Sequence, residues 1–178
     1  MTTMMETAPG LRGVRLAAIG DAPAPAIEAL LDLAFGTDRH QRTAYRLRAG
    51  VPHEAPASCV AFDRNDILIG SLQSWPLGLF GADGAVTPLW LIGPIAVHPD
   101  HRNEGIGRAM LRRALEAIDT TTIPAVLIGD FDYYAPFGFS ADATGGWALP
   151  GPVDRNRLLA RLTSGATVPA DGMLGPRA

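Results

Sequence analysis

The stretch that decides the fold is HPDHRNEGIGRAM, residues 98–110, which lies between an apolar run and an amphipathic segment. It places two glycines two positions apart, Gly105 and Gly107, where a turn needs at most one. A helix start leaves about four backbone N–H groups without intrahelical partners and carries about half a positive charge. Glycines remove the Cβ atoms that would hold an anion away from these groups. The stretch predicts a phosphate site at a helix start, to which Arg102 adds a charged donor; a tight loop without a ligand is the alternative.

The segments on either side predict a strand, a helix and a second strand. Residues 87–99, TPLWLIGPIAVHP, are apolar and carry Gly93-Pro94 in their middle, which predicts a strand broken by a bulge. Residues 105–119, GIGRAMLRRALEAID, form the most clearly amphipathic helix of the chain. Its apolar face comprises Ile106, Met110, Leu111, Ala114, Leu115 and Ile118. Residues 123–129, IPAVLIG, predict a buried strand, so the three segments form a right-handed parallel crossover.

The rest of the chain predicts an α/β (α+β) fold with a mixed, mostly antiparallel sheet and helices on both faces. Upstream we expect a strand over 13–19, helices over 24–36 and 42–50, and a hairpin of 57–63 with 66–77 around an Arg64-Asn65 turn. Downstream we expect a strand near 137–141 and a final helix over 152–162, with Leu158, Leu159 and Leu162 inward. The 178 residues fit a single domain, 1–178, with tails over about 1–9 and 164–178.

Composition excludes several classes of partner. The net charge is -3, and all 15 basic residues are arginines with no more than two in a row, so we expect no nucleic-acid partner. No segment has the length or apolarity of a signal peptide or membrane span, which predicts a cytoplasmic protein without a membrane partner. The single cysteine, Cys59, forms no intramolecular disulfide. His98 and His101 have HxxH spacing, but Pro99 keeps them off a helix and no third ligand is evident, so we expect no metal.

Two well-known phosphate-binding motifs are absent. A P-loop requires a lysine, and the chain has none. A dinucleotide fingerprint requires GxGxxG after the first strand and an acidic residue about 20 positions later, and neither is present. The pattern that remains is Arg-x-x-Gly-x-Gly, from Arg102 through Gly105 to Gly107.

Two ordered motifs resemble a known family. Residues 92–111, IGPIAVHPDHRNEGIGRAML, are similar to the acetyl-CoA-binding motif of the GNAT N-acetyltransferase superfamily. Residues 133–139, YYAPFGF, resemble that superfamily's next motif. LLDLAFGTDRHQRTAYRLRAG and LIGDFDYYAPFGF look like the YhbS-like subgroup, so the resemblance covers about residues 12–163.

The resemblance implies that acetyl-CoA is the cosubstrate and lies where the central parallel strand pair splays in a V, between a strand ending at Val97 and one ending near Gly129. A bulge at Gly93-Pro94 agrees with such a splay. The implied cofactor-binding residues are Ile95, Ala96 and Val97 on the strand and Arg102, Asn103, Gly105, Ile106, Gly107 and Arg108 around the diphosphate. Many members have glycine in place of Asn103, and asparagine tolerates a positive φ. We expect the Glu104 carboxylate to point to solvent.

For catalysis, the resemblance places the general acid at Tyr134, with Tyr133 packed inward. Some members have a glutamate that acts as general base where this chain has Leu91, so that role cannot be carried over. Asp130, His53 or a water relay could accept the proton of the amine, or the amine could already be neutral. The expected reaction is N-acetyl transfer to a primary amine by direct attack in a ternary complex. The acceptor is unidentified, either a small-molecule amine or a peptide or protein amine, and monomer and homodimer remain open. The alternatives are a non-catalytic acyl-CoA-binding or regulatory module and an interaction domain that has lost the cofactor.

Overall fold

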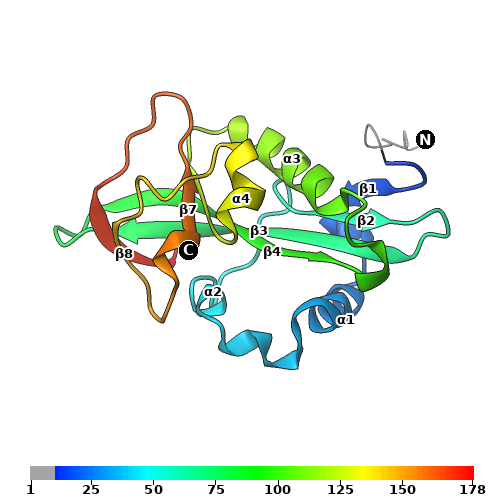
Figure 1. The fold of residues 1–178 in the computed structure, drawn as a ribbon. Coiled ribbons are helices and arrows are strands. Elements are labelled where there is room, and N and C mark those ends of the chain that lie inside the picture. Colours follow the sequence, from blue (N-terminus) through cyan, green and yellow to red (C-terminus); the bar gives the residue numbers. More distant parts are fainter. Residues whose placement is uncertain (1–10) are drawn as a thin grey trace. The chain divides into compact units, whose positions relative to one another are not determined.

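A computed structural model describes residues 11–178 (Figure 1). The tail expected over about residues 1–9 lies outside the described residues. The α-helices are α1 (Ala24–Phe35), α2 (Thr43–Arg46), α3 (Ile106–Asp119) and α4 (Phe131–Tyr134). The strands are β1 (Arg15–Ala18), β2 (Cys59–Phe62), β3 (Leu68–Phe80), β4 (Val86–Val97), β5 (Ala125–Ile128), β6 (Gly146–Ala148), β7 (Leu158–Arg161) and β8 (Asp171–Pro176).

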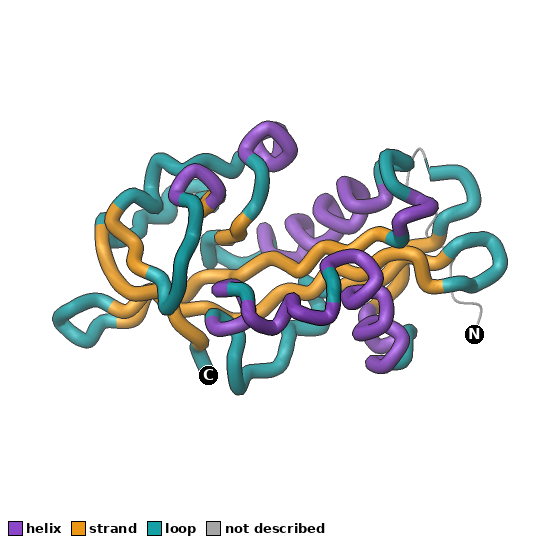
Figure 2. The backbone as a smooth tube through the Cα atoms, turned by 60° about the horizontal axis from the view of Figure 1, so that its bottom comes forward, coloured by secondary structure: helices purple, strands orange, loops and turns teal. Residues whose placement is uncertain are grey.

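The chain divides into two compact units. The first comprises Met1–Arg39, Glu54–Ser74 and Pro94–Ala117, and the second His40–His53, Trp75–Gly93 and Ile118–Ala178. The longest strands, β3 and β4 with 13 and 12 residues, each contribute residues to both units. Figure 2 draws the strands in orange and the helices in purple. The prediction of a single domain over residues 1–178 stays a prediction.

In the first unit, β2 pairs antiparallel with both β1 and β3. The expected hairpin between β2 and β3 is present, and the Asp63 carboxylate accepts hydrogen bonds from the Asn65 and Ile67 N–H groups in its turn. Because side chains alternate along a strand, the two faces of β2 pack against different helices. Val60 and Phe62 pack in a core with α1, whereas Cys59 contacts Met110 of α3. Helices α1 and α3 therefore cover opposite faces of these strands (Figure 1).

Helix α3 confirms the predicted apolar face. All six predicted side chains are at most 6% exposed: Ile106, Met110, Leu111, Ala114, Leu115 and Ile118. Gly70 of β3 brings the helix close, because a Cβ there would meet Met110 Cε at 3.0 Å and Ile106 Cγ2 at 3.1 Å. The sheet under α3 is thus shaped to receive the start of the helix.

In the second unit, β4 and β5 form the central parallel pair of the sheet. The described pairing joins Trp90 to Ala125 and Leu91 to Val126. Strand β5 also pairs antiparallel with β7, β3 pairs antiparallel with β8, and β8 pairs parallel with β6. The sheet order is β1-β2-β3-β4-β5-β7, with β8 on β3 and β6 on β8. The predicted fold class, a mixed and mostly antiparallel sheet with one central parallel pair and helices on both faces, is confirmed.

The expected final helix over residues 152–162 is wrong. This segment contains a short 3-10 turn, Arg155–Arg157, followed by strand β7. Leu158, Leu159 and Ala160 are all buried, as expected of a strand covered on both faces, while Leu162 is 43% exposed. A short apolar run fits either a helix or a buried strand. Here the run forms a strand that pairs antiparallel with β5.

The expected tail over residues 164–178 is also wrong, because β8 belongs to the sheet. Residues Leu77–Phe80 of β3 pair with β8 along four positions. The glycines that suggested a loose tail allow this approach, since a Cβ on Gly172 would meet the Leu79 side chain at 2.8 Å and one on Gly175 would meet Phe80 at 3.3 Å. Across residues 11–178, no helix combines the length and apolarity needed to cross a membrane.

Candidate active site

The loop between β4 and α3 turns the chain with two residues of positive φ. His98 caps a 3-10 turn, Pro99–His101, by accepting the Asp100 N–H at its Nδ1. Asn103 then has a φ of 66° and Gly105 a φ of 84°. A Cβ on Gly105 would find only Leu11, at 3.7 Å, so the backbone conformation rather than lack of space requires glycine there.

Two main-chain donors, the N–H groups of Ile106 and Gly107, lie at the start of α3, where an exposed loop leads into two buried residues. The hydrogen bond that begins the helix runs from the Ala109 N–H to the Gly105 carbonyl, at 3.0 Å. The N–H groups of Ile106 and Gly107 lie ahead of that bond, at the positive end of a helix of 14 residues. The preceding residues, 102–105, are exposed. This arrangement suits an anion such as a diphosphate.

The Glu104 carboxylate, which we expect to point to solvent, is exposed and also contacts a neighbouring side chain. One of its carboxylate oxygens lies 3.2 Å from His101 Nδ1, and its side chain is 49% exposed. The imidazole therefore fixes the only acidic group of residues 102–108 on the side where His101 lies.

Strand β4 approaches this loop through Ile95, Ala96 and Val97. Ala96 is 1% exposed and packs in the core with α1. Its two neighbours are partly exposed, as alternation along a strand predicts. The next residue, His98, donates its N–H to the Ile69 carbonyl of β3 at 2.8 Å, which ties the end of the strand down.

The strand is irregular at Gly93, where the sequence predicts a bulge. Gly93 has a φ of 113°, outside the range of a regular strand. Its carbonyl accepts hydrogen bonds from two side chains, Trp75 Nε1 at 3.0 Å and Arg48 Nη1 at 3.3 Å. Pro94 follows and has no N–H to donate. Arg48, which sequence reasoning missed, is only 7% exposed.

Tyr134 lies at the end of α4, directly after β5. Its ring rests against the backbone of Gly129, where a Cβ would lie 2.3 Å from Tyr134 Cε2. Tyr133 and Phe139 contact the ring edge-on, with centroids at 4.8 and 6.0 Å. Burial, and to a lesser extent Tyr133 and Asp130, raises the pKa of Tyr134 from 10.0 to about 12. The phenol therefore keeps its proton at neutral pH.

The open candidates for a general base have different surroundings. The Asp130 side chain is 79% exposed and lies 3.3 Å from the Arg157 guanidinium. His53 packs edge-on against Trp75, with centroids 5.7 Å apart, and its Nδ1 is buried without a hydrogen-bond partner among the described residues. Leu91 is 2% exposed in the core of the second unit.

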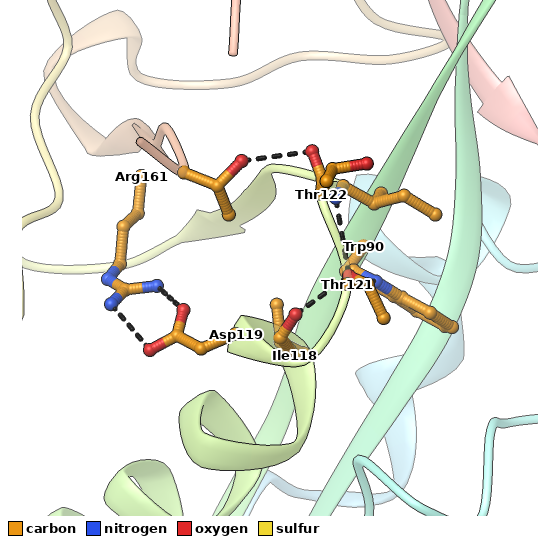
Figure 3. Close-up of polar contacts among 8 residues, drawn as sticks. Trp90, Ile118, Asp119, Thr121, Thr122 and Arg161 are labelled. Carbon is orange, nitrogen blue, oxygen red and sulfur yellow. Dashed lines mark hydrogen bonds and ion pairs between the residues drawn. The ribbon is translucent and has the colours of Figure 1, made fainter. Parts of the chain in front are cut away.

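The turn from α3 into β5 is built from polar contacts (Figure 3). Thr121 donates its hydroxyl to the Ile118 carbonyl and accepts the Trp90 indole N–H at 3.3 Å. Arg161 holds both oxygens of Asp119, at 2.6 and 3.0 Å, and so neutralises a carboxylate at the negative end of α3. These contacts tie the end of α3 and the turn after it to β4 and β7.

The predicted residues divide between the units. Residues 95–97 and 102–108 belong to the first unit, and Tyr134, Asp130 and His53 to the second. Within residues 11–178, no group of three or more His, Cys, Asp and Glu side chains is arranged to hold a metal ion.

Comparisons with known proteins agree with this fold and show the family. The family model described as "Acetyltransferase (GNAT) domain" matches residues 15–141, well over half of the chain. The structure of Escherichia coli YhbS, a GNAT family N-acetyltransferase in complex with CoA, has a TM-score of 0.74 at 23% identity and covers 96% of this chain and 93% of that one. A GNAT family acetyltransferase from Brucella melitensis, in complex with acetyl-CoA, has a TM-score of 0.65 at 22% identity, covering 93% and 96%. No curated protein sequence matches. The chain belongs to the GNAT acetyltransferase family.

Proposed function

We propose that this protein transfers the acetyl group of acetyl-CoA to a primary amine by direct attack in a ternary complex. The observation that carries the proposal is the start of α3, where Asn103 and Gly105 adopt positive φ and main-chain N–H groups precede the first helical hydrogen bond. Family membership supports it, as do the CoA and acetyl-CoA complexes of the similar E. coli and Brucella proteins.

Cofactor binding is assigned to two stretches of the first unit. The amides of Gly105, Ile106 and Gly107 donate to the diphosphate, supported by Arg102, Asn103 and Arg108. Ile95, Ala96 and Val97 line the pantetheine arm, and the amides of Ile95 and Val97 donate to it as a neighbouring strand would. An N–H at the same strand end stabilises the thioester oxygen as it gains charge.

Tyr134 is assigned as the general acid. The acceptor nitrogen forms a bond to the acetyl carbon, the carbon–sulfur bond breaks, and the sulfur leaves with the electron pair. Tyr134 donates its proton to the departing sulfur, so that CoA leaves as a thiol and not as a free thiolate. A thiol, with a pKa of about 8.5, is more acidic than a phenol, so the tyrosinate left behind takes a proton back from water before the next turnover. The nitrogen loses its proton to Asp130, to His53 or to a water relay, or the amine attacks already neutral.

The acceptor is a small-molecule amine or an amine of a peptide or protein. A cytoplasmic location, a single domain and a monomeric or homodimeric state stay predictions.

The test combines binding and turnover. Calorimetry with acetyl-CoA should show saturable binding, and a panel of primary amines should contain an acceptor that releases thiol in proportion to acetylated product. Binding without turnover across a broad panel would favour a non-catalytic acyl-CoA module. If the protein binds no acetyl-CoA at about millimolar concentration, the remaining interpretation is an interaction domain that has lost the cofactor.

A further inference from the structure

The carbonyl of Gly93 sits at the point where β4 leaves regular geometry. It accepts hydrogen bonds from the side chains of Trp75 and Arg48. Gly93 itself has a φ of 113°, outside the range of a regular strand. Pro94, directly before Ile95, supplies no N–H to a neighbouring strand.

The two donors belong to one stacked cluster within the second unit. The Arg48 guanidinium carbon lies 3.7 Å from the centroid of the Tyr45 ring and 4.8 Å from that of Trp75. Such stacking fixes the planar guanidinium and aims its N–H groups. Trp75 is part of β3, so its indole reaches Gly93 from a rigid element.

Helix α2, which directly precedes Leu47 and Arg48, is held in place by hydrogen bonds to another segment. Thr43 donates its hydroxyl to the Pro152 carbonyl at 2.6 Å, and Arg46 donates to the Pro150 carbonyl at 2.7 Å. Leu47, next to Arg48, is completely buried. Gly151 allows this docking, because a Cβ there would meet Thr43 Oγ1 at 2.7 Å. A four-residue helix is therefore held tightly enough to position the arginine that follows it.

We propose that Arg48 and Trp75 are positioning residues for the acyl-donor site, acting as a clamp on the Gly93 carbonyl. The clamp keeps β4 distorted at Gly93, so that the amides of Ile95 and Val97 remain aimed at the pantetheine arm. This inference rests on the proposed function. It adds that the distortion depends on two side-chain donors and is not a property of Gly93-Pro94 alone.

The test compares two ligands in variants that remove the donors and keep much of the bulk of each side chain. Trp75→Phe keeps an aromatic ring without the indole N–H, and Arg48→Met keeps an unbranched apolar stem without the guanidinium. The ligands are acetyl-CoA and ADP, which carries the diphosphate but no pantetheine arm. Trp90→Phe is the matched control, because it removes an indole N–H that is donated to Thr121.

Each single variant should raise the Kd of acetyl-CoA about 3- to 10-fold, because one donor to the carbonyl remains. The double variant should raise it by at least about 30-fold, since a partly buried carbonyl then has no side-chain donor. The Kd of ADP should stay within about twofold in every variant, and Trp90→Phe should leave both ligands within about twofold. Arg48→Lys, which keeps one donor group, should fall between wild type and Arg48→Met.

Several outcomes would overturn the clamp. One is a double variant whose acetyl-CoA Kd stays within about twofold of wild type. Another is an equal rise in the Kd of ADP and of acetyl-CoA, which would indicate a general loss of structure. A third is a rise in the Kd of acetyl-CoA in Trp90→Phe as large as that in Trp75→Phe. If wild type binds acetyl-CoA and acetylates an amine, these results reject the clamp alone. If wild type binds no acetyl-CoA, the proposed function fails and the clamp falls with it.

Discussion

The loop at the start of α3 and the surroundings of Tyr134 build their chemistry in opposite ways. The loop is exposed over residues 102–105, where Asn103 and Gly105 have positive φ, and it leads into the main-chain N–H groups of Ile106 and Gly107. Tyr134 offers one side chain, held by packing against Gly129, Tyr133 and Phe139 and desolvated enough to raise its pKa to about 12. Changes in the loop should therefore alter cofactor affinity, and changes around Tyr134 should alter turnover.

The largest expected effect is that of Tyr134→Phe. The variant should lower kcat by at least about tenfold, because the departing thiolate loses its proton donor, while the Kd of acetyl-CoA stays within about twofold. Gly129→Ala should lower kcat comparably with the hydroxyl still present, since the new Cβ displaces the ring. Steady-state kinetics and calorimetry separate the two quantities. Unchanged turnover in Tyr134→Phe would remove the assignment.

The pH dependence sharpens the same assignment. Burial raises the pKa of Tyr134 to about 12, so the phenol keeps its proton up to and beyond its ordinary pKa of 10.0. Wild-type kcat should show no alkaline decline caused by this group below about pH 10. A decline below that pH that disappears in Tyr134→Phe would contradict the raised pKa.

Gly105→Ala should act on the other region. Alanine is strained at a φ of 84°, so the loop should shift and the Kd of acetyl-CoA should rise about tenfold, with kcat at saturation much less affected. Gly84→Ala is the matched control, because Gly84 has a φ of 83° in the β3–β4 hairpin with nothing within 4 Å of a new Cβ. Equal losses of affinity in both variants would mean that the effect is one of stability alone.

Glu104→Gln should have a smaller effect of opposite sign. Removing a negative charge beside the diphosphate should lower the Kd of acetyl-CoA about 2- to 3-fold at low salt, and the gain should shrink as salt rises. Glu116→Gln, a charge change at an exposed position further along α3, is the control. Calorimetry at two salt concentrations measures both, and weaker binding by Glu104→Gln would show that this carboxylate supports the loop.

The smallest effect should come from Cys59→Ala. Burial raises the pKa of the Cys59 thiol to about 12, so the folded protein holds it as an unreactive thiol. Turnover should stay within about twofold, and thiol reagents should label the native protein only after unfolding. A large loss of turnover with an acetylated Cys59 would contradict direct attack in a ternary complex.

The contrast also explains what the sequence can predict. The α3 loop was predictable because glycine and asparagine report φ directly, and the apolar face of α3 because its period of 3.6 residues is sustained over 14 residues. The sequence predicts a helix where strand β7 lies, because LLAR is too short to show a period. It does not predict β8, because the glycines of that strand allow close packing against Leu79 and Phe80 and resemble those of a loop.

Arg48 shows the limit most clearly. In RLRAG it resembles any surface arginine. Its guanidinium stacks on Tyr45, three positions earlier, but only the fold brings it against Trp75 and next to the carbonyl of Gly93. Side chains that act through contacts distant in the sequence leave no local pattern. The raised pKa of Tyr134 has the same origin, because burial is its largest cause.

The most direct test of the central claim is a crystal structure of the protein with CoA. The account predicts diphosphate oxygens within about 2.7–3.2 Å of the main-chain nitrogens of Gly105, Ile106 and Gly107. A fully occupied CoA whose diphosphate lies elsewhere, with those amides bonded to the protein's own groups, would contradict it.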